Sequence, residues 1–260
     1  MTTTPTIRIE SFASDLPVTL VDHGTGRPVL VLHGGAGPTS VARFVDAMAA
    51  THRVLAPTHP GFGGTPRPDR LASIAALAAT YAQLLERLDL TDVLVIGFSI
   101  GGWIASELAL RAGERLRGAV LVDAVGIEVD GETCADVFAL KPNELSALSM
   151  HDPVKYGIDP STLTPEQKAA MAANFQALAA YGGASMDATL RARLAAVKTP
   201  ALVVWGESDR IVTPAYGRAF AEAFDGARFE LIPQCGHLPQ VEQPARLLEL
   251  VNGFDATTAA

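Results

Sequence analysis

The chain has 260 residues, of which 48% are hydrophobic and 18% are charged, and its formal net charge is −8. This composition is typical of one large folded domain with a sizeable core, and it excludes a disordered chain. The acidic balance disfavours nucleic acid and anionic membranes as partners, so we expect the partner to be a small-molecule substrate.

The first residues do not show the basic and then apolar layout of a signal peptide, and no apolar run is long enough to span a membrane. We therefore expect a cytoplasmic protein. Cys134 and Cys235 are the only cysteines, and we expect two thiols, with one disulfide as the alternative. No zinc-ligand spacing and no phosphate-binding loop occurs, so neither a metal nor a cofactor is predicted. The oligomeric state stays open between monomer and homodimer.

Short apolar runs bounded by Gly and Pro clusters recur along the chain and predict eight strands. They lie at residues 7–12, 18–21, 29–32, 53–56, 93–97, 119–122, 201–205 and 228–232. Helices are predicted between most of them and at the end, at residues 40–50, 72–88, 100–112, 214–224 and 244–254. The first two strands predict an antiparallel pair. The later alternation predicts an α/β fold, a mostly parallel eight-stranded sheet with helices on both faces.

The alternation stops between residues 125 and 194. Short helices are predicted there at residues 136–140, 143–148, 165–181 and 186–194, separated by Pro and Gly clusters. Such a helical block is best explained as a cap inserted at 125–194 over the carboxyl edge of the strands, with the core at 1–124 and 195–260. Six apolar side chains in and near the cap are predicted to line a pocket, with burial in the cap's own core as the alternative: Phe98, Leu238, Phe138, Met150, Phe175 and Leu178.

Residues 93–102 read Val-Leu-Val-Ile-Gly-Phe-Ser-Ile-Gly-Gly, which predicts a strand, a sharp turn at Ser99 and then a helix. Small residues stand at Gly97 and Gly101, where a side chain would collide. This G-x-S-x-G pattern lifts the Ser99 hydroxyl out of the sheet and places the N–H of Ile100 at a helix N-terminus, where negative charge is stabilised. The pattern alone is a weak signal, because Gly and Ser are common at such turns.

Two further polar residues, Asp209 and His237, each follow a predicted strand. Ligands bind at this carboxyl edge in open α/β sheets. Together with Ser99 they give the order Ser, Asp, His of an α/β-hydrolase triad, in which His takes the serine proton and the acid orients His. Asp123 also ends its strand, and it is the alternative acid.

A Gly-rich loop at residues 33–38 follows the buried strand at 29–32. Its backbone N–H groups are expected to face Ser99, so that Gly35 is the second oxyanion donor beside Ile100; the alternative is a simple tight connection. His33 is expected to orient this loop by hydrogen bonding.

Four motifs in this order resemble those of the α/β-hydrolase superfamily: His33-Gly34-Gly35, Gly97-Phe98-Ser99-Ile100-Gly101-Gly102, Trp205-Gly206-Glu207-Ser208-Asp209-Arg210 and Cys235-Gly236-His237. The resemblance covers residues 27–254 and implies the serine-nucleophile branch with a helical cap. It implies that Ser99, Asp209 and His237 are catalytic and that Gly35 and Ile100 form the oxyanion hole. Serine instead of aspartate at the turn implies acyl chemistry.

One branch of the superfamily cleaves carbon–carbon bonds in ring-opened dienones and shares the loop at His33 and the motif at His237. This chain departs from that branch, because Phe98 stands where Asn is usual and Leu238 where Trp is usual. Basic residues in the predicted cap are few, which disfavours a carboxylated substrate: Lys141, Lys155, Lys168, Arg191 and Arg193.

We therefore predict a serine hydrolase that cleaves a small, largely apolar ester, thioester or lactone through an acyl-enzyme. A carbon–carbon bond hydrolase of ring-cleaved dienones is the first alternative. A ligand-binding protein that keeps the fold without catalysis is the second.

Overall fold

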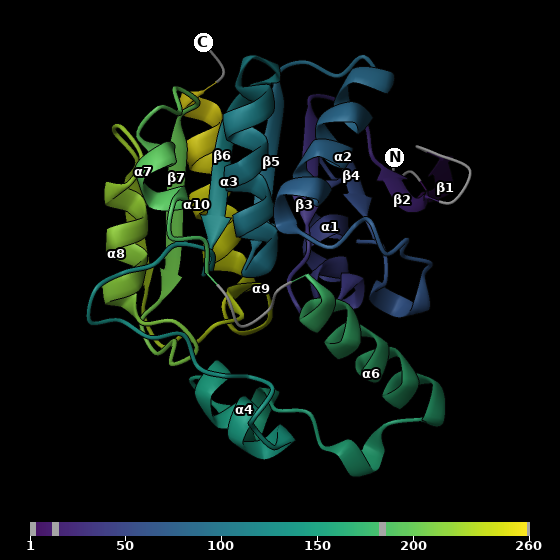
Figure 1. Cartoon of the computed structure of the whole chain (residues 1–260), viewed down its shortest axis with the longest axis vertical. Helices are drawn as coiled ribbons and strands as arrows, with labels where there is room; N and C mark the ends of the chain where they lie inside the picture. The colour runs from purple at the N-terminus through teal and green to yellow at the C-terminus, as the bar shows by residue number, and fades with distance from the viewer. Residues whose placement is uncertain (1–3, 12–15, 182–185, 259–260) are drawn as a thin grey trace.

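One β-sheet runs through the middle of the molecule (Figure 1). The structure is a computed structural model, and within the residues that it describes (4–11, 16–181 and 186–258) eight strands pair in the order β1-β2-β4-β3-β5-β6-β7-β8. Their bounds are β1 Thr6–Ser11, β2 Pro17–His23, β3 Pro28–Leu32, β4 Arg53–Pro57, β5 Val93–Phe98, β6 Leu116–Val122, β7 Ala201–Gly206 and β8 Arg228–Ile232. The predicted strands are confirmed, while Phe12 of the first one lies outside the described residues.

The strand directions divide the sheet into two parts. β1 pairs antiparallel with β2, and β2 pairs antiparallel with β4. All the remaining pairs, from β4 through β3, β5, β6 and β7 to β8, are parallel. Every residue of β5, β6 and β7 is buried, as expected for continuous apolar strands that are covered on both faces. The predicted α/β fold is therefore confirmed.

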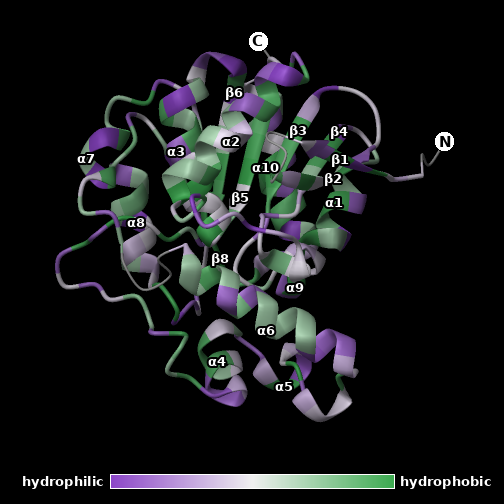
Figure 2. Cartoon of the chain, turned by 45° about the vertical axis from the view of Figure 1, so that its right-hand side comes forward, coloured by the Kyte–Doolittle hydropathy of each residue, from purple (hydrophilic) through white to green (hydrophobic). Residues whose placement is uncertain are grey.

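Helices cover both faces of the sheet. α1 (Ala42–Met48) and α10 (Pro244–Thr257) pack their apolar residues on one face. α2 (Ile74–Arg87), α3 (Ile100–Ala112) and α8 (Pro214–Glu222) contribute to a second and larger core cluster on the other face. Figure 2 shows the apolar colour gathered on the central strands between these layers. Four short helices lie in the connections between these elements: η1 Pro38–Val41, η2 Phe62–Gly64, η3 Gly113–Arg115 and α9 Pro239–Glu242.

A second group of helices lies outside these two layers. Between β6 and β7 the chain forms α4 (Pro142–Ser149), α5 (Pro153–Tyr156), η4 (Pro160–Thr162) and α6 (Pro165–Ala180). These four elements are called the cap helices below, and Figure 1 shows α4 and α6 beyond one end of the sheet. α7 (Leu190–Leu194) instead packs its leucines into the main core beside α3. The division of the chain at residues 124 and 195 stays a prediction. None of the helices in the described part of the chain has the length and apolar character needed to cross a membrane.

The helix predicted at residues 136–140 is wrong, because this segment forms a turn. The Oδ1 of Asp136 accepts a hydrogen bond from the N–H of Phe138 (3.1 Å), which favours a turn over a helix. Pro142 disfavours helical backbone at the residue before it, so the next helix begins only at Pro142 itself.

The helix predicted at residues 186–194 is too long, because only α7 is helical there. Asp187 forms an isolated β-bridge with Ile127, and its Oδ1 accepts from the N–H of Thr189 (2.8 Å). These contacts fix a non-helical backbone immediately before α7.

Candidate active site

Ser99 occupies a strained turn between β5 and α3. Its backbone has φ 52° and ψ −116°, a left-handed conformation that residues other than Gly rarely adopt. A Cβ at Gly97 would lie 2.2 Å from the carbonyl oxygen of Gly101, and a Cβ at Gly101 would lie 2.2 Å from the carbonyl oxygen of Leu32. Both glycines are therefore required sterically, and the chain has the sharp strand-turn-helix geometry that the sequence predicts.

Ser99, His237 and Asp209 form one chain of hydrogen bonds. The Nε2 of His237 lies 3.0 Å from the Oγ of Ser99, and its Nδ1 lies 2.7 Å from the Oδ2 of Asp209. Asp209 is buried, and its Oδ1 accepts from the N–H groups of Ile211 (2.8 Å) and Val212 (3.1 Å). With Asp209 ionised, Nδ1 donates and Nε2 accepts from the serine hydroxyl. This is the arrangement of a nucleophile with its general base.

Asp123, the alternative acid, lies behind Asp209. It directly follows β6, and its Oδ1 accepts a hydrogen bond from the N–H of Gly206 (2.8 Å). The carboxylate that meets the Nδ1 of His237 is that of Asp209. The geometry therefore favours Asp209 over Asp123 as the acid that orients the imidazole.

The loop after β3 passes over the Ser99 turn. A Cβ at Gly34 would lie 3.2 Å from the Cβ of Ser99, and Gly35 and Ile100 both line the cavity into which Ser99 faces. Ile100 is the first residue of α3, so its N–H has no acceptor within the helix. The structure thus brings the two predicted oxyanion donors to the same cavity as Ser99.

Two buried histidines support this loop. The Nε2 of His33 accepts from the N–H of His59 (3.1 Å), so its Nδ1 carries the proton and donates to the carbonyl oxygen of Gly34 (2.8 Å). His59 in turn lies with its Nδ1 2.5 Å from the hydroxyl of Tyr81. Burial lowers the pKa of His33 to about 4 and lowers that of His59 as well. Both rings are therefore neutral at pH 7. His33 orients the loop as predicted, and His59 holds His33 in place.

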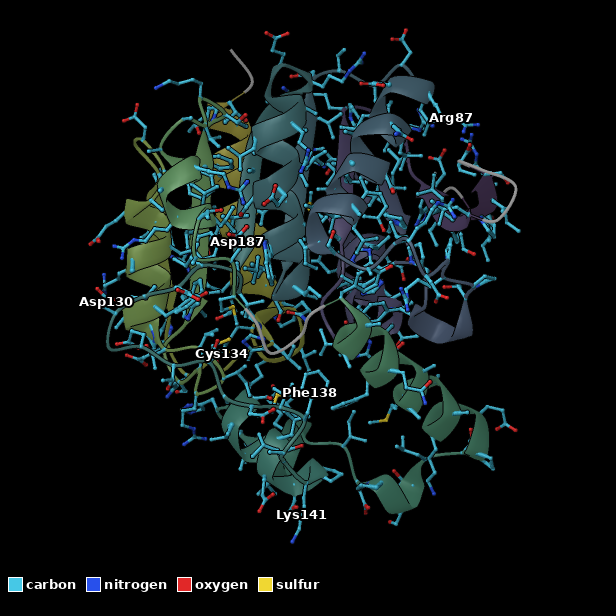
Figure 3. The ribbon with its side chains drawn as sticks, in the orientation of Figure 1. Arg87, Asp130, Cys134, Phe138, Lys141 and Asp187 are labelled. Atoms are coloured by element: carbon cyan, nitrogen blue, oxygen red, sulfur yellow. The ribbon has the colours of Figure 1, made fainter. Side chains whose placement is uncertain are left out.

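A cavity of about 230 Å³ lies over Ser99, between the edge of the sheet and the cap helices. Ser99 and His237 lie in its wall, which is otherwise mostly apolar. Five of the six predicted pocket residues line it: Phe98, Leu238, Met150, Phe175 and Leu178. Phe138 is not among the residues that line it. Its ring is exposed and packs edge-on against the ring of Phe175, with the centroids 6.1 Å apart. Figure 3 labels Phe138 beside the cap helices.

The cavity wall carries no cation. All 20 lysines and arginines lie within the residues that the structure describes, and none of them lines the cavity. Arg193, at the end of the predicted cap, pairs with Glu107 and Asp187 (both 2.6 Å). Arg191 lies 3.9 Å from Glu222 on α8. The carboxylate of a bound substrate would therefore meet no ion-pair partner in this wall.

A model of the alpha/beta hydrolase family matches residues 29–250 of this chain. The chain belongs to this family. The matched residues include the Ser99 turn, both candidate acids and His237, and the mostly parallel sheet is the family's fold.

Several relatives of this α/β-hydrolase are named as hydrolases, and similar solved structures include esterases. The 2-hydroxymuconate semialdehyde hydrolase of Pseudomonas sp. (strain CF600) is 29% identical, covering 98% of this chain and 96% of that protein. A thermophilic esterase from Thermogutta terrifontis superimposes with a TM-score of 0.77 at 24% identity, covering 99% of this chain and 100% of that one. A meta-cleavage product hydrolase from Pseudomonas fluorescens IP01 gives 0.74 at 24% identity, with 92% and 93% covered. A hydrolase role follows for this chain, while the solved structures show likeness of fold.

Asn174, which the sequence analysis missed, connects the cap helices to the loop after β3 that carries Gly35. It is buried in α6, and its Nδ2 donates to the carbonyl oxygen of Ala36 (2.9 Å) while its Oδ1 accepts from the N–H of Gly63 (2.7 Å). Its sequence signal is weak, an amide side chain among the alanines of a predicted helix that also holds Gln167 and Gln176.

Glu242 was also missed, and it fastens the cap to the His237 loop. This buried carboxylate accepts from the N–H groups of His151 (3.0 Å), Asp152 (3.0 Å) and Gly236 (2.6 Å). Its partners are all backbone groups from two segments far apart in sequence, so no side-chain pattern marks them. Hydrogen bonds of Asn174 and Glu242 thus connect the cap to the two loops that carry Gly35 and His237.

Proposed function

We propose that this α/β-hydrolase is a serine hydrolase that cleaves small, uncharged and largely apolar esters, thioesters or lactones. One observation carries the proposal. The hydrogen-bonded chain of Ser99, His237 and Asp209 opens into an apolar cavity whose wall holds no lysine or arginine. Such a wall accommodates an uncharged acyl or alcohol group without leaving a buried charge unpaired.

The geometry supports an acyl-enzyme mechanism. The Oγ of Ser99 attacks the substrate carbonyl carbon while the Nε2 of His237 takes the hydroxyl proton, and Asp209 stabilises the imidazolium that forms. The N–H groups of Gly35 and Ile100 hold the oxyanion, and one such donor contributes on the order of 3 kcal/mol. His237 then gives its proton to the departing alkoxide or thiolate. Water, activated by the same imidazole, attacks the acyl-enzyme and releases the acid and Ser99.

The second candidate function is hydrolysis of carbon–carbon bonds in ring-cleaved dienoates. A relative 28% identical to this chain is named 2-hydroxy-6-oxo-2,4-heptadienoate hydrolase, and its named substrate carries a carboxylate. Burying that carboxylate without a cation costs several kcal/mol. Because Arg191 and Arg193 pair away from the cavity, the structure favours the uncharged substrate.

Steady-state assays on two substrate panels test the proposal. The first panel holds p-nitrophenyl acetate, butyrate and octanoate with neutral γ- and δ-lactones, and the second holds ring-cleaved dienoates. We expect turnover of the first panel and a kcat/KM at least about tenfold lower for the second, equivalent to the loss of one moderate charge interaction. Faster turnover of a dienoate, lost in an Arg193→Gln variant, would reverse the assignment. Tight binding of panel members without any turnover would favour a ligand-binding protein.

A further inference from the structure

A second carboxyl group lies buried directly behind the candidate triad. Asp123 is fully buried at the end of β6, with a backbone φ of 44°. One side-chain atom from each of Asp123, Asp209 and His237 lies within 4.8 Å of the other two. The Oδ1 of Asp123 accepts from the N–H of Gly206, whereas its Oδ2 is buried and receives no hydrogen bond from any described residue. A deprotonated Oδ2 can only accept hydrogen bonds, so burying it without a donor costs free energy. A protonated Oδ2 avoids this cost because it can itself donate.

The hydrogen-bond donors around the two carboxyls decide which of them holds a proton. Asp209 receives the N–H groups of Ile211 and Val212 on one oxygen and the imidazole of His237 on the other. Asp123 receives a single backbone N–H. Two buried carboxylates this close cannot both be ionised, and the charge stays on the one with more donors. Asp209 is therefore the carboxylate and Asp123 the acid.

We propose that Asp123 is a neutral carboxylic acid whose Oδ2–H donates a hydrogen bond to the carboxylate of Asp209. Asp123 then extends the chain Asp209, His237, Ser99 by one member. It acts as a positioning residue, because it touches neither the substrate nor the imidazole nitrogen that carries the proton. Its effect on turnover rests on the proposed function of His237 as the general base.

The surroundings of Asp123 agree with a neutral acid. Burial and the charge of Asp209 raise the pKa of Asp123 well above its usual value, against the hydrogen bond from Gly206, which lowers it. The titratable groups that face it are Asp209, Glu242, the thiol of Cys235 and the imidazole of His237. No lysine or arginine stands among them to hold a second negative charge.

The hydrogen bond from Asp123 has two consequences for the base. It fixes the plane of the Asp209 carboxylate, whose other oxygen is already held by Ile211 and Val212. It also draws electron density away from that carboxylate, which weakens the attraction between Asp209 and an imidazolium at His237. Without the donor, Asp209 stabilises the imidazolium more strongly.

Two substitutions at the same position separate this role from a merely structural one. Asp123→Asn keeps a donor toward Asp209 and an acceptor toward Gly206, whereas Asp123→Leu keeps a branched side chain of four heavy atoms and removes both. We expect kcat/KM to fall by less than about tenfold in Asp123→Asn and by about 10- to 100-fold in Asp123→Leu, as for the loss of one hydrogen bond to a charged group. The acid limb of the kcat/KM pH profile should stay in place in the Asn variant and move to higher pH in the Leu variant.

Two activity outcomes would overturn the proposal. A loss of about 10⁴-fold in Asp123→Asn would show that Asp123 must be ionised and is itself the acid of the triad. An unmoved acid limb in a folded Asp123→Leu variant would show that Asp123 only fills space. If the Leu variant does not fold, the spectroscopic test that follows decides.

Infrared spectroscopy tests the proton on Asp123 without turnover, so it stands even if the proposed function fails. The experiment compares Ser99→Ala with Ser99→Ala/Asp123→Asn at pH 7, using aspartate labelled with carbon-13 to identify the band. We expect the carbonyl stretch of a neutral carboxylic acid in the single variant and its loss in the double variant. Absence of that band in the single variant would refute the neutral acid.

Discussion

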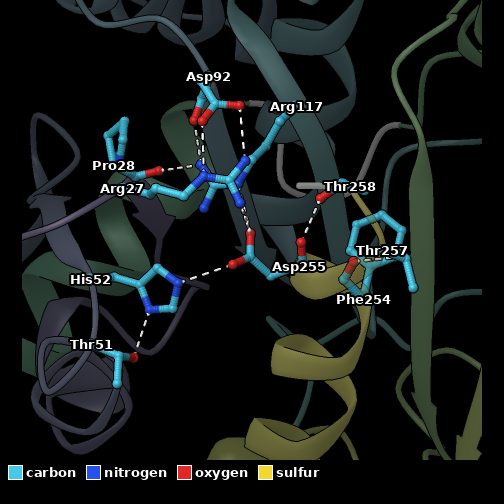
Figure 4. Close-up of polar contacts among 10 residues, drawn as sticks. All are labelled: Arg27, Pro28, Thr51, His52, Asp92, Arg117, Phe254, Asp255, Thr257 and Thr258. Atoms are coloured by element: carbon cyan, nitrogen blue, oxygen red, sulfur yellow. Dashed lines mark hydrogen bonds and ion pairs between the residues drawn. The ribbon is translucent and has the colours of Figure 1, made fainter. Parts of the chain in front are cut away.

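Two clusters of charged side chains lie at opposite ends of the same sheet, and they are built in opposite ways. At the amino ends of the parallel strands, Asp255 of α10 accepts from the Nε of Arg117 (2.6 Å) and lies 3.0 Å from the Nε2 of His52 (Figure 4). Arg27 lies beside it and makes two hydrogen bonds to Asp92, at 2.9 and 3.0 Å. Every carboxylate in this cluster has a cationic partner.

At the carboxyl ends of the strands, the carboxyls outnumber the cations. Asp123 and Asp209 share one imidazole, and Glu242 stands nearby with only backbone donors. Ser99 and Asp123 both hold backbone conformations with positive φ. Burial raises the pKa of Asp123, whereas hydrogen bonds from Arg117 and His52 outweigh burial at Asp255 and lower its pKa.

The difference separates a structural cluster from the candidate active site. Compensated charges, as around Asp255, stabilise the fold and tie α10 to the strand ends. Uncompensated groups and strained backbone persist at the other end because the rest of the fold holds them in place, and such features gather at active sites. Four substitutions test this division, from the largest expected effect to the smallest.

Asp209→Asn should lower kcat by about 10⁴-fold, because the imidazole then loses the acceptor that fixes its tautomer. Circular dichroism and thermal unfolding should show a folded protein. Steady-state kinetics on p-nitrophenyl butyrate measures the effect. Loss of less than about tenfold, with a large loss in Asp123→Asn instead, would move the acid to Asp123.

Asp255→Asn should do the reverse and lower stability while leaving kcat unchanged. The side chain of Arg117 is 2% exposed, and removing its partner costs about 3 kcal/mol. Because the pKa of Asp255 is lowered in the folded protein, its stabilisation is present above about pH 3.9 and is lost as the pH falls through the folded value. Urea unfolding at pH 7 and pH 2 measures both effects. Equal stability of variant and wild type at pH 7 would contradict the assigned role.

Glu242→Gln should lower kcat/KM by about tenfold, because an amide group then faces one of the N–H donors that the carboxylate now accepts. Hydrogen exchange should become faster at the amides of His151, Asp152 and Gly236. Glu249→Gln is the matched control, since Glu249 lies exposed on α10 and pairs with Arg246 at 2.8 Å. If both variants behave alike, Glu242 does not position the His237 loop.

Asp123→Asn should have the smallest effect of the four substitutions. The quantity that it changes is the pH dependence of the free energy of unfolding. A raised pKa in the folded protein means that the stability contributed by protonated Asp123 is complete below about pH 3.9 and is lost as the pH rises. The Asn variant escapes this loss, so its stability relative to wild type should increase between pH 4 and pH 7. For Asp255→Asn, the stability difference from wild type should instead shrink as the pH falls below about 3.9. A pH-independent difference between Asp123→Asn and wild type would argue against a buried neutral acid.

The sequence predicted the strands and the meeting of Ser99, Asp209 and His237 because both follow from local signals. Apolar runs mark buried strands, and polar residues just after parallel strands must share one edge of the sheet. The position of Phe138 could not be predicted from these signals, because it depends on a turn at Asp136 that forms in place of the expected helix. The roles of Asn174 and Glu242 could not be predicted from the sequence for another reason. Their partners are backbone groups of distant segments, which no residue pattern records.

Labelling with a fluorophosphonate probe, followed by peptide mapping, tests the central claim most directly. Ser99 should carry the adduct, since it is the serine whose hydroxyl lies 3.0 Å from the imidazole of His237. Labelling should be lost in Ser99→Ala and strongly slowed in Asp209→Asn, while Asp255→Asn should label at the wild-type rate. An adduct on another serine of the cavity wall, such as Ser149, or a folded Ser99→Ala variant that still labels and turns over esters, would contradict the account.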